Sequence, residues 1–360
     1  MELSPYVGKI FGIKLQLHWS FLLLLVFAFL VSAYAVVPFY LFILVILLFL
    51  SVLVHELAHS LTAKRNNLIV RKIVLLPLGG ASIIENMDNI DPHIEFKVAL
   101  VGPLVSIFLG MFFGVIAAIF YTYSFVDILQ FLFVINILLG IFNILPAFPM
   151  DGGRVLKSYL MQRMDIINAT KKAVKVSDAF IILFIFGTVI YAWVDKYSFV
   201  YNEFIVLWDL FIAMYLYQGG RAELFGAYIK KYAARMKIKD VMTKNYQLLN
   251  INADIGQIYD KLTNKRSHII LIKDGSLMRI LSKIPSNMFS SKKFDIKKIS
   301  NPIPTIKNDD LLLRAIEKMV DLNVGIIAVT KKDIVCGIVT QSHAESVIAL
   351  YIRKLQDGHN

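Results

Sequence analysis

Residues 15–54 read LQLHWSFLLLLVFAFLVSAYAVVPFYLFILVILLFLSVLV and contain no Asp, Glu, Lys or Arg. A helix rises about 1.5 Å per residue, so this stretch would be roughly 60 Å long and could cross a hydrocarbon core of about 30 Å twice. A signal peptide has a much shorter apolar region and a small-residue cleavage site, which this stretch lacks. We therefore expect two membrane-spanning helices rather than a removable leader.

The composition of the whole chain also favours a membrane protein, because 57% of its 360 residues are hydrophobic and only 18% are charged. The single cysteine, Cys336, excludes an internal disulfide framework and a cysteine cluster for zinc or iron–sulfur. The net charge of +12 comes mostly from Lys and Arg scattered through the last third, without an aromatic-flanked basic stripe. Such a face is typical of solvated protein near anionic lipid, so no nucleic-acid partner is expected.

Further apolar runs follow the first one. Residues 98–126, 128–150 and 179–194 contain no acidic or basic residue, a weaker run covers about 199–217, and Pro38 divides the opening run. We predict a polytopic α-helical membrane protein with six transmembrane helices, near residues 17–37, 39–62, 96–121, 126–145, 177–195 and 199–218.

Basic residues in the flanking segments predict the orientation, because short loops rich in Lys and Arg stay on the cytoplasmic side. The N-terminal segment and the second-to-third and fourth-to-fifth connections carry twelve basic residues, whereas the three opposite connections carry one, Lys196. Both termini should therefore face the cytoplasm in a multi-pass protein of the cell membrane. The twelve basic residues are Lys9, Lys14, Lys64, Arg65, Arg71, Lys72, Arg154, Lys157, Arg163, Lys171, Lys172 and Lys175.

The connection at residues 68–85 has a different pattern. Branched aliphatic residues precede a Pro77-Leu78-Gly79-Gly80 sequence, which predicts a strand and a turn. Lipid would leave the backbone groups of such a strand unpaired, so it should lie at the membrane surface or line a protein-walled cavity.

After about residue 221 the composition becomes that of a soluble α/β domain. The segments 238–282 and 296–340 share the order helix, strand, turn, strand, which indicates an internal repeat of roughly 58 residues. We therefore divide the chain into a transmembrane domain, a linker and a cytoplasmic pair of repeats. Their bounds are 1–220, 221–235 and 236–354, with the repeats at about 238–285 and 296–345.

The second predicted span ends in His55-Glu56-Leu57-Ala58-His59. Two His residues four apart lie on one face of a helix and can share an ion, while Glu56 can reach a water on that ion. With a carboxylate from elsewhere, the pair would leave a fourth position on Zn²⁺ for the water. A polar helix end that meets lipid headgroups is the alternative, although ionisable groups beside a long apolar run favour a functional role.

Asp151 is the candidate for the third ligand. It is the only carboxylate between Asp127 and Asp165, and the predicted topology places it at the same depth as the two His residues. Prolines on either side of Phe148 break the helix before it. An N-cap for the following helix is the alternative role for Asp151.

Together these motifs resemble the site-2 protease type of intramembrane zinc metalloprotease, in particular archaeal and bacterial members with a C-terminal pair of CBS domains. The matching motifs occur in family order and at family spacing over nearly the whole chain. They are the HELAH pentapeptide, Pro77-Leu78-Gly79-Gly80, Gly102-Pro103-Leu104-Val105-Ser106 and the segment from Asn143 to Arg154.

The resemblance implies that His55, His59 and Asp151 bind one zinc ion per chain and that Glu56 is the general base. Asn143 would hold substrate backbone or the oxyanion, with a helix–helix hydrogen bond as its alternative role, and the 68–85 strand would be an edge to which an unwound substrate adds. The implied function is hydrolysis of peptide bonds within or near transmembrane segments of membrane-protein substrates in the bilayer.

The two C-terminal repeats resemble CBS domains, which pair and often bind adenine nucleotides. In the family, an Asp after the final strand bonds the ribose. Here Gly337-Ile338-Val339-Thr340 is intact, but His343 and Pro285 stand at the two Asp positions. Adenine nucleotides are therefore not expected to bind tightly, and ligand sensing, a structural role and homodimer formation through the pair all stay open.

A transporter or channel gated by CBS domains is the alternative function, but it gives no reason for four ionisable residues to lie at one depth. Two further polar residues have open roles. His18 begins the first predicted span, where a headgroup contact competes with a catalytic or gating role. Asp209 lies in the sixth span, where a contact with neighbouring helices or water competes with a role at a substrate gate.

Overall fold

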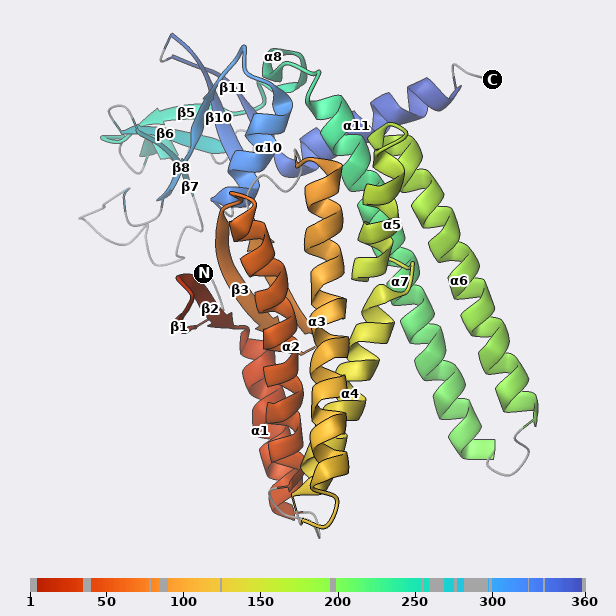
Figure 1. The fold of residues 1–360 in the computed structure, drawn as a ribbon. Coiled ribbons are helices and arrows are strands. Elements are labelled where there is room, and N and C mark those ends of the chain that lie inside the picture. The colour runs from red at the N-terminus through yellow and green to blue at the C-terminus, as the bar shows by residue number, and fades with distance from the viewer. Residues whose placement is uncertain are drawn as a thin grey trace. The chain divides into compact units, whose positions relative to one another are not determined.

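The computed structural model (Figure 1) describes residues 5–34, 40–77, 79–84, 90–123, 125–194, 199–253, 256–258, 269–274, 277–281, 297, 300–322, 324–332 and 334–357. Lys196 and Pro285, on which two of the expectations rest, lie outside these ranges. The chain forms two compact units, Met1–Leu224 and Phe225–Asn360.

Helices dominate the first unit. Four of them in the described part are long and apolar enough to cross a membrane, over Phe42–Arg65, Pro92–Ile119, Val126–Ile144 and Ile166–Tyr191. The first predicted span is the shorter apolar helix α1, and the sixth lies within α7. The helices are α1 (Trp19–Tyr34), α2 (Tyr40–Arg65), α3 (Pro92–Ile119), α4 (Val126–Ile144), α5 (Asp151–Met161), α6 (Ile166–Val194) and α7 (Phe199–Ala233).

Figure 1 shows α1 to α4 as long helices side by side. The helices α3 and α4 approach closely at Gly140 of α4. A Cβ on this residue would lie 2.9 Å from the carbonyl oxygen of Pro103 on α3. A Cβ on Gly110 of α3 would likewise lie 2.8 Å from the side chain of Ile137. Small residues at such crossings allow the close backbone packing that membrane helices use.

A four-stranded sheet accompanies the helices, in the order β1 (Tyr6–Ile10), β2 (Ile13–Leu17), β3 (Val70–Leu76), β4 (Gly79–Ile84). The strands β2 and β3 are parallel, with α1 and α2 as the crossover between them, whereas β3 and β4 form an antiparallel hairpin. Ile73 and Leu75 are buried against Val52 of α2. The strand and turn expected at 68–85 are thus present as β3 and β4, packed on the helix that carries the HELAH sequence.

The second unit contains two sheets of the same design. In the first, β5 is parallel to β6 and β6 is antiparallel to β7; in the second, β9, β10 and β11 repeat this pattern. The strand β8 completes the first sheet. The elements are α8 (Ile238–Val241), β5 (Gln247–Asn250), β6 (Ile270–Asp274), β7 (Leu277–Leu281), β8 (Ser300–Ile303), β9 (Thr305–Lys307), α10 (Leu312–Asp321), β10 (Ile326–Lys331), β11 (Ile334–Thr340) and α11 (Gln341–Asp357).

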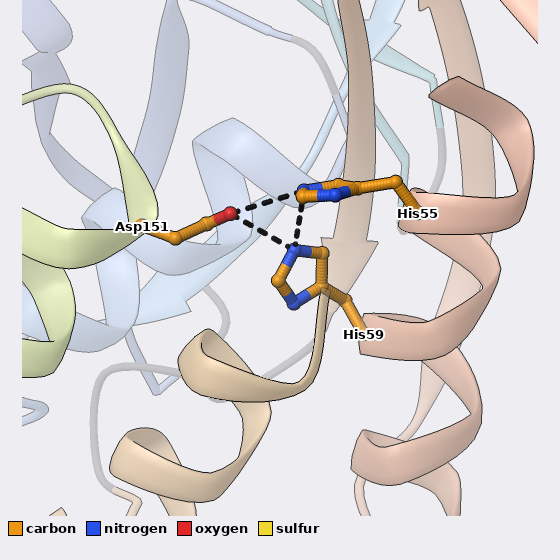
Figure 2. A group of neighbouring side chains, drawn as sticks. All are labelled: His55, His59 and Asp151. Atoms are coloured by element: carbon orange, nitrogen blue, oxygen red, sulfur yellow. Dashed lines mark hydrogen bonds and ion pairs between the residues drawn. The ribbon is translucent and has the colours of Figure 1, made fainter. Parts of the chain in front are cut away.

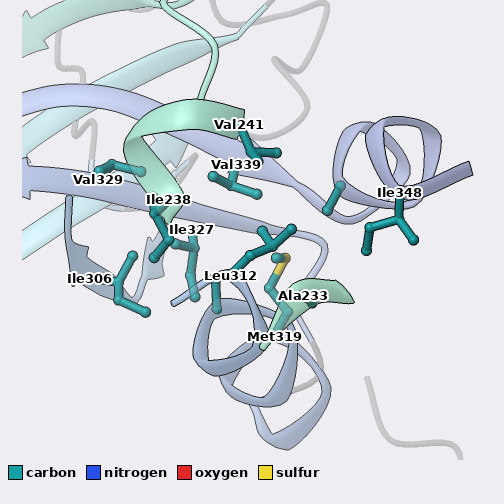
Figure 3. Packing of buried hydrophobic residues seen from close by; sticks show 12 residues of the cluster. Ala233, Ile238, Val241, Ile306, Leu312, Met319, Ile327, Val329, Val339 and Ile348 are labelled. Atoms are coloured by element: carbon teal, nitrogen blue, oxygen red, sulfur yellow. The ribbon is translucent and has the colours of Figure 1, made fainter. Parts of the chain in front are cut away.

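Aliphatic side chains fill the core of the second unit. Figure 3 shows Ile238, Leu312, Ile327 and Val339 packed between the sheet and its helices. A second cluster joins the repeats, because Leu271 and Met278 of the first pack against Ile326, Ala328 and Ile338 of the second. The repeats therefore share apolar surface and fold as a pair. The segment predicted as a linker, 221–235, is helical as far as Ala233.

Candidate metal centre

The side chains of His55, His59 and Asp151 converge on one point (Figure 2). Both His residues lie on α2, one turn apart, and Asp151 is the first residue of α5. The two Nε2 atoms are 3.1 Å apart, and Oδ2 of Asp151 is 3.1 Å from each of them. A tetrahedral zinc ion with bonds of about 2.0–2.1 Å separates its ligand atoms by roughly 3.3 Å, so these three atoms fit one ion.

The outer nitrogen of each ring is held by α3. Nδ1 of His59 donates to the carbonyl oxygen of Val98 at 2.6 Å, and Nδ1 of His55 lies 2.9 Å from the hydroxyl of Ser106. A carbonyl oxygen only accepts, so the proton of a neutral His59 ring is on Nδ1 and its Nε2 presents a lone pair. Two imidazole nitrogens and a carboxylate oxygen then face one another, which is the donor set of a cation site.

Gly102 of α3 gives the two rings their space. A Cβ on Gly102 would overlap Nε2 of His59 and lie 2.9 Å from Nε2 of His55. Only a residue without a side chain allows α3 to pass this close to the ring nitrogens. Sequence reasoning noted the Gly102-to-Ser106 motif but assigned no role to its residues.

Glu56 does not join the three converging groups; its carboxylate meets β4. The hydroxyl of Ser82 donates to Oε2 of Glu56 at 2.7 Å. A Cβ on Gly80 would overlap Cγ of Glu56, so the strand backbone passes directly beside this side chain. Gly80, one of the glycines that predicted a turn, therefore also leaves the space that Glu56 occupies.

The turn between α4 and α5 delivers Asp151. Phe148 is almost fully buried and its backbone N–H donates to the hydroxyl of Ser177 on α6 at 3.2 Å. A Cβ on Gly152 would overlap the carbonyl oxygen of Ile144, so the turn requires glycine there. Oδ2 of Asp151 faces Nε2 of both His rings at 3.1 Å, and the residue before α5, Met150, makes no side-chain capping hydrogen bond. The N-cap alternative for Asp151 is therefore wrong.

A cavity of about 550 Å³ adjoins the centre. Its lining includes the three converging side chains, Glu56, the β4 segment from Gly79 to Ser82, Asn143 and Arg154. The amide of Asn143 donates to the carbonyl oxygen of Leu139 in its own helix at 2.9 Å. Among the recorded contacts, Asn143 thus bonds its own helix, and its side chain borders the cavity.

The remaining polar candidates lie elsewhere in the described residues. Nδ1 of His18 is 2.6 Å from the hydroxyl of Ser20, and His18 is not part of the cavity lining. Asp209 accepts a hydrogen bond from Thr188 of α6 at 2.8 Å and borders a second, smaller cavity. Neither residue is brought to the metal centre. His343 lies in the second unit, at the start of α11.

Comparison with known proteins identifies the family. The family model of peptidase family M50 matches residues 43–126 and 118–186, and the CBS domain model matches residues 295–349. The chain is 32% identical over 281 residues to a zinc metalloprotease of Methanocaldococcus jannaschii, covering 77% of this chain and 78% of that protein. The chain belongs to peptidase family M50.

The chain is also similar to a second curated protein and to a solved structure. The chain is 26% identical over 374 residues to Rip3 of Mycobacterium tuberculosis, covering 96% of this chain and 93% of that protein. It is 30% identical to the solved structure of a site-2 protease from M. jannaschii, covering 61% of this chain and 95% of that one, with a TM-score of 0.44.

Proposed function

We propose that the chain is an intramembrane zinc endopeptidase that hydrolyses peptide bonds within or near the transmembrane segments of membrane-protein substrates. The observation that carries this proposal is the convergence of His55, His59 and Asp151 beside a cavity that also contains Glu56. Membership in a peptidase family leaves the alternative of a CBS-gated transporter or channel without support.

The three converging side chains would hold one zinc ion per chain. When bound, the ion supplies Lewis-acid polarisation of the scissile carbonyl and lowers the pKa of the attacking water. Glu56 takes the proton of that water and passes it to the leaving amine. Val98 and Ser106 hold Nδ1 of the two rings, which would keep both Nε2 atoms available as ligands.

An extended substrate segment would bind along β4. This strand ends the sheet order β1-β2-β3-β4 in the described part, and its residues from Gly79 to Ser82 line the cavity. Addition of a strand at such an edge satisfies the backbone of an unwound substrate by main-chain hydrogen bonds. Asn143 borders the same cavity and would bind substrate backbone or the oxyanion.

The experiment that tests this function is a pair of substitutions in the full-length protein. Glu56→Gln should retain zinc and abolish cleavage of a fluorescence-quenched apolar peptide in detergent, whereas His59→Ala should lose both zinc and cleavage. Zinc is measured by elemental analysis. Cleavage near the wild-type rate in Glu56→Gln would rule out the mechanism.

We further propose that all six predicted spans cross the membrane, with both termini and the C-terminal pair in the cytoplasm. The asymmetry of basic residues across the connections supports this orientation. In a background with Cys336→Ser, Thr122→Cys should react with an impermeant thiol reagent added to intact cells, and Gln162→Cys should not. The opposite pattern would reverse the orientation.

For the C-terminal pair, residues 236–354, we propose a regulatory or dimerising role, with the zinc endopeptidase domain at 1–220. The shared core of the two repeats supports a single folded pair.

Because His343 replaces the ribose-binding Asp and such a hydrogen bond contributes about 1.5–3 kcal/mol, ATP and AMP should bind only weakly. Calorimetry on the full chain tests this, and light scattering tests the homodimer; a low-micromolar dissociation constant would contradict weak binding.

A further inference from the structure

Ser82 has a hydrogen-bonding position that the function described so far does not use. Its hydroxyl lies 2.7 Å from Oε2 of Glu56 and 3.0 Å from the hydroxyl of Ser60. The hydroxyl of Ser82 has one proton, which it donates to Oε2 of Glu56 as the nearer of two acceptors, since the carbonyl oxygen of Glu56 lies at 3.3 Å. Ser60 then donates to Ser82, and the three groups form a chain with one direction.

These hydrogen bonds join two elements that are distant in sequence. Glu56 and Ser60 are four residues apart on α2 and share one face of that helix, whereas Ser82 comes from β4. Ser60 is fully buried, so its hydroxyl is a fixed support for Ser82. On the strand side, a Cβ on Gly80 would lie 2.9 Å from Cδ of Glu56. The carboxylate is thus confined between helix and strand.

The hydrogen bond from Ser82 restricts the orientation of the Glu56 carboxylate. It is charge-assisted and holds Oε2 against β4. A glutamate side chain that is free to rotate spends only part of its time in a reactive geometry, and small misplacements of a catalytic group reduce rates strongly. Ser82 removes that freedom.

We propose that Ser82, supported by Ser60, is a positioning residue that orients Glu56 for proton abstraction and couples this orientation to substrate binding on β4. The inference rests on the proposed peptidase function. The coupling follows because Ser82 and the substrate edge belong to the same strand, so displacement of β4 would move the hydrogen-bond donor of the base together with the bound substrate.

The test compares two substitutions of the same shape, Ser82→Thr and Ser82→Val. Both are β-branched and suit a strand, but only Thr retains the hydroxyl, so effects on folding cancel in the comparison. We expect Ser82→Thr to keep kcat within about threefold of wild type and Ser82→Val to have a kcat about tenfold lower than Ser82→Thr. KM for the apolar peptide and zinc content should be alike in the two variants.

Two controls complete the design. Ser158 is also fully buried, but it bonds only the carbonyl oxygen of Val155 in its own helix among the recorded contacts, so Ser158→Ala should leave kcat unchanged. Ser60→Ala removes the hydrogen bond to Ser82 but leaves the one between Ser82 and Glu56, so it should lower kcat by about two- to threefold. Cleavage by wild type and its loss in Glu56→Gln are measured in the same series.

The outcomes separate the two proposals. Wild type without cleavage, or Glu56→Gln with cleavage, contradicts the peptidase function itself. Wild type with normal cleavage and equal kcat values for Ser82→Thr and Ser82→Val would overturn the role of Ser82 alone, as would a difference between them that appears in KM or zinc content rather than in kcat.

Discussion

The first unit contains two largely buried polar clusters that each include a residue of α5 but combine different charges. The acceptor triad, His55, His59 and Asp151, brings two imidazole nitrogens and a carboxylate oxygen to 3.1 Å from one another. The lysine triad places Nζ of Lys157 at 2.6 Å from Glu223 and 2.7 Å from Glu95. The first cluster offers ligand atoms for an ion from solution, whereas the second contains its own cation, Lys157.

The lysine triad ties together the helices that build the metal centre. Lys157 is on the helix that begins with Asp151, Glu95 is on the helix that supplies Val98 and Gly102, and Glu223 is on α7. Burial lowers the pKa of Lys157, but the carboxylates of Glu223 and Glu95 raise it more, so the pKa lies above its ordinary value of 10.5. The contribution of Lys157 to stability is therefore present at neutral pH and is lost as pH rises through the raised pKa.

The comparison predicts that breaking the acceptor triad removes metal and leaves the fold. Structural zinc sites have binding free energies of about 10–16 kcal/mol, so loss of one ligand should weaken binding by roughly 10³-fold. Asp151→Ala should therefore lose zinc and cleavage while the thermal unfolding midpoint of the metal-free protein stays near that of metal-free wild type. Competition with a chelator measures the affinity. Asp209→Asn is the matched control, and a similar affinity in both variants would contradict the prediction.

Breaking the lysine triad should have the opposite result, a loss of stability. Lys157→Met leaves the buried carboxylate of Glu95 and the partly exposed one of Glu223 without their cation, and breaking a buried pair costs about 3–5 kcal/mol. The midpoint of thermal unfolding in detergent should fall clearly, and Lys172→Met, at an exposed position on α6, should not change it. Combining Lys157→Met with Glu95→Gln and Glu223→Gln should restore part of the lost unfolding midpoint. An unchanged midpoint in Lys157→Met would show that the ion pairs contribute little.

A smaller effect is expected where the acceptor triad meets α3. Gly102→Ala introduces a methyl group that would overlap Nε2 of His59, so one ring must shift and zinc affinity should fall by about ten- to a hundredfold. Gly187→Ala on α6 has no atom within 4 Å of the new methyl group and serves as the control. Equal zinc affinities in the two variants would mean that α3 moves away to accommodate the added methyl group.

The part of the metal centre that sequence could predict is the part encoded by local spacing. His55, Glu56 and His59 follow from their places on one helix, and Asp151 from being the lone carboxylate of a helix-breaking segment. The partners from α3 and β4, such as Ser106 and Ser82, depend on tertiary packing that no local pattern encodes. For Val98 the contact is made by the backbone, so the side chain gives no signal.

Two helices also begin or end beyond their apolar runs. The fifth predicted span starts at 177, but α6 begins at Ile166, because its first turns are rich in Lys and hydropathy detects only the membrane part. The sixth ends at 218, whereas α7 continues to Ala233. Lys157, counted among the loop residues that set the orientation, is instead buried on the short helix α5.

The parallel pairing of β2 with β3 has a consequence for biosynthesis. The two strands flank α1 and α2, so β3 can join β2 only after both helices have left the ribosome and folded back on each other. The strand β4, with the hydroxyl of Ser82, follows later, and Asp151 emerges only after α3 and α4. A nascent chain therefore holds its pair of imidazoles long before it holds a complete ligand set, and the order of synthesis itself delays proteolytic competence until the helical bundle is in place.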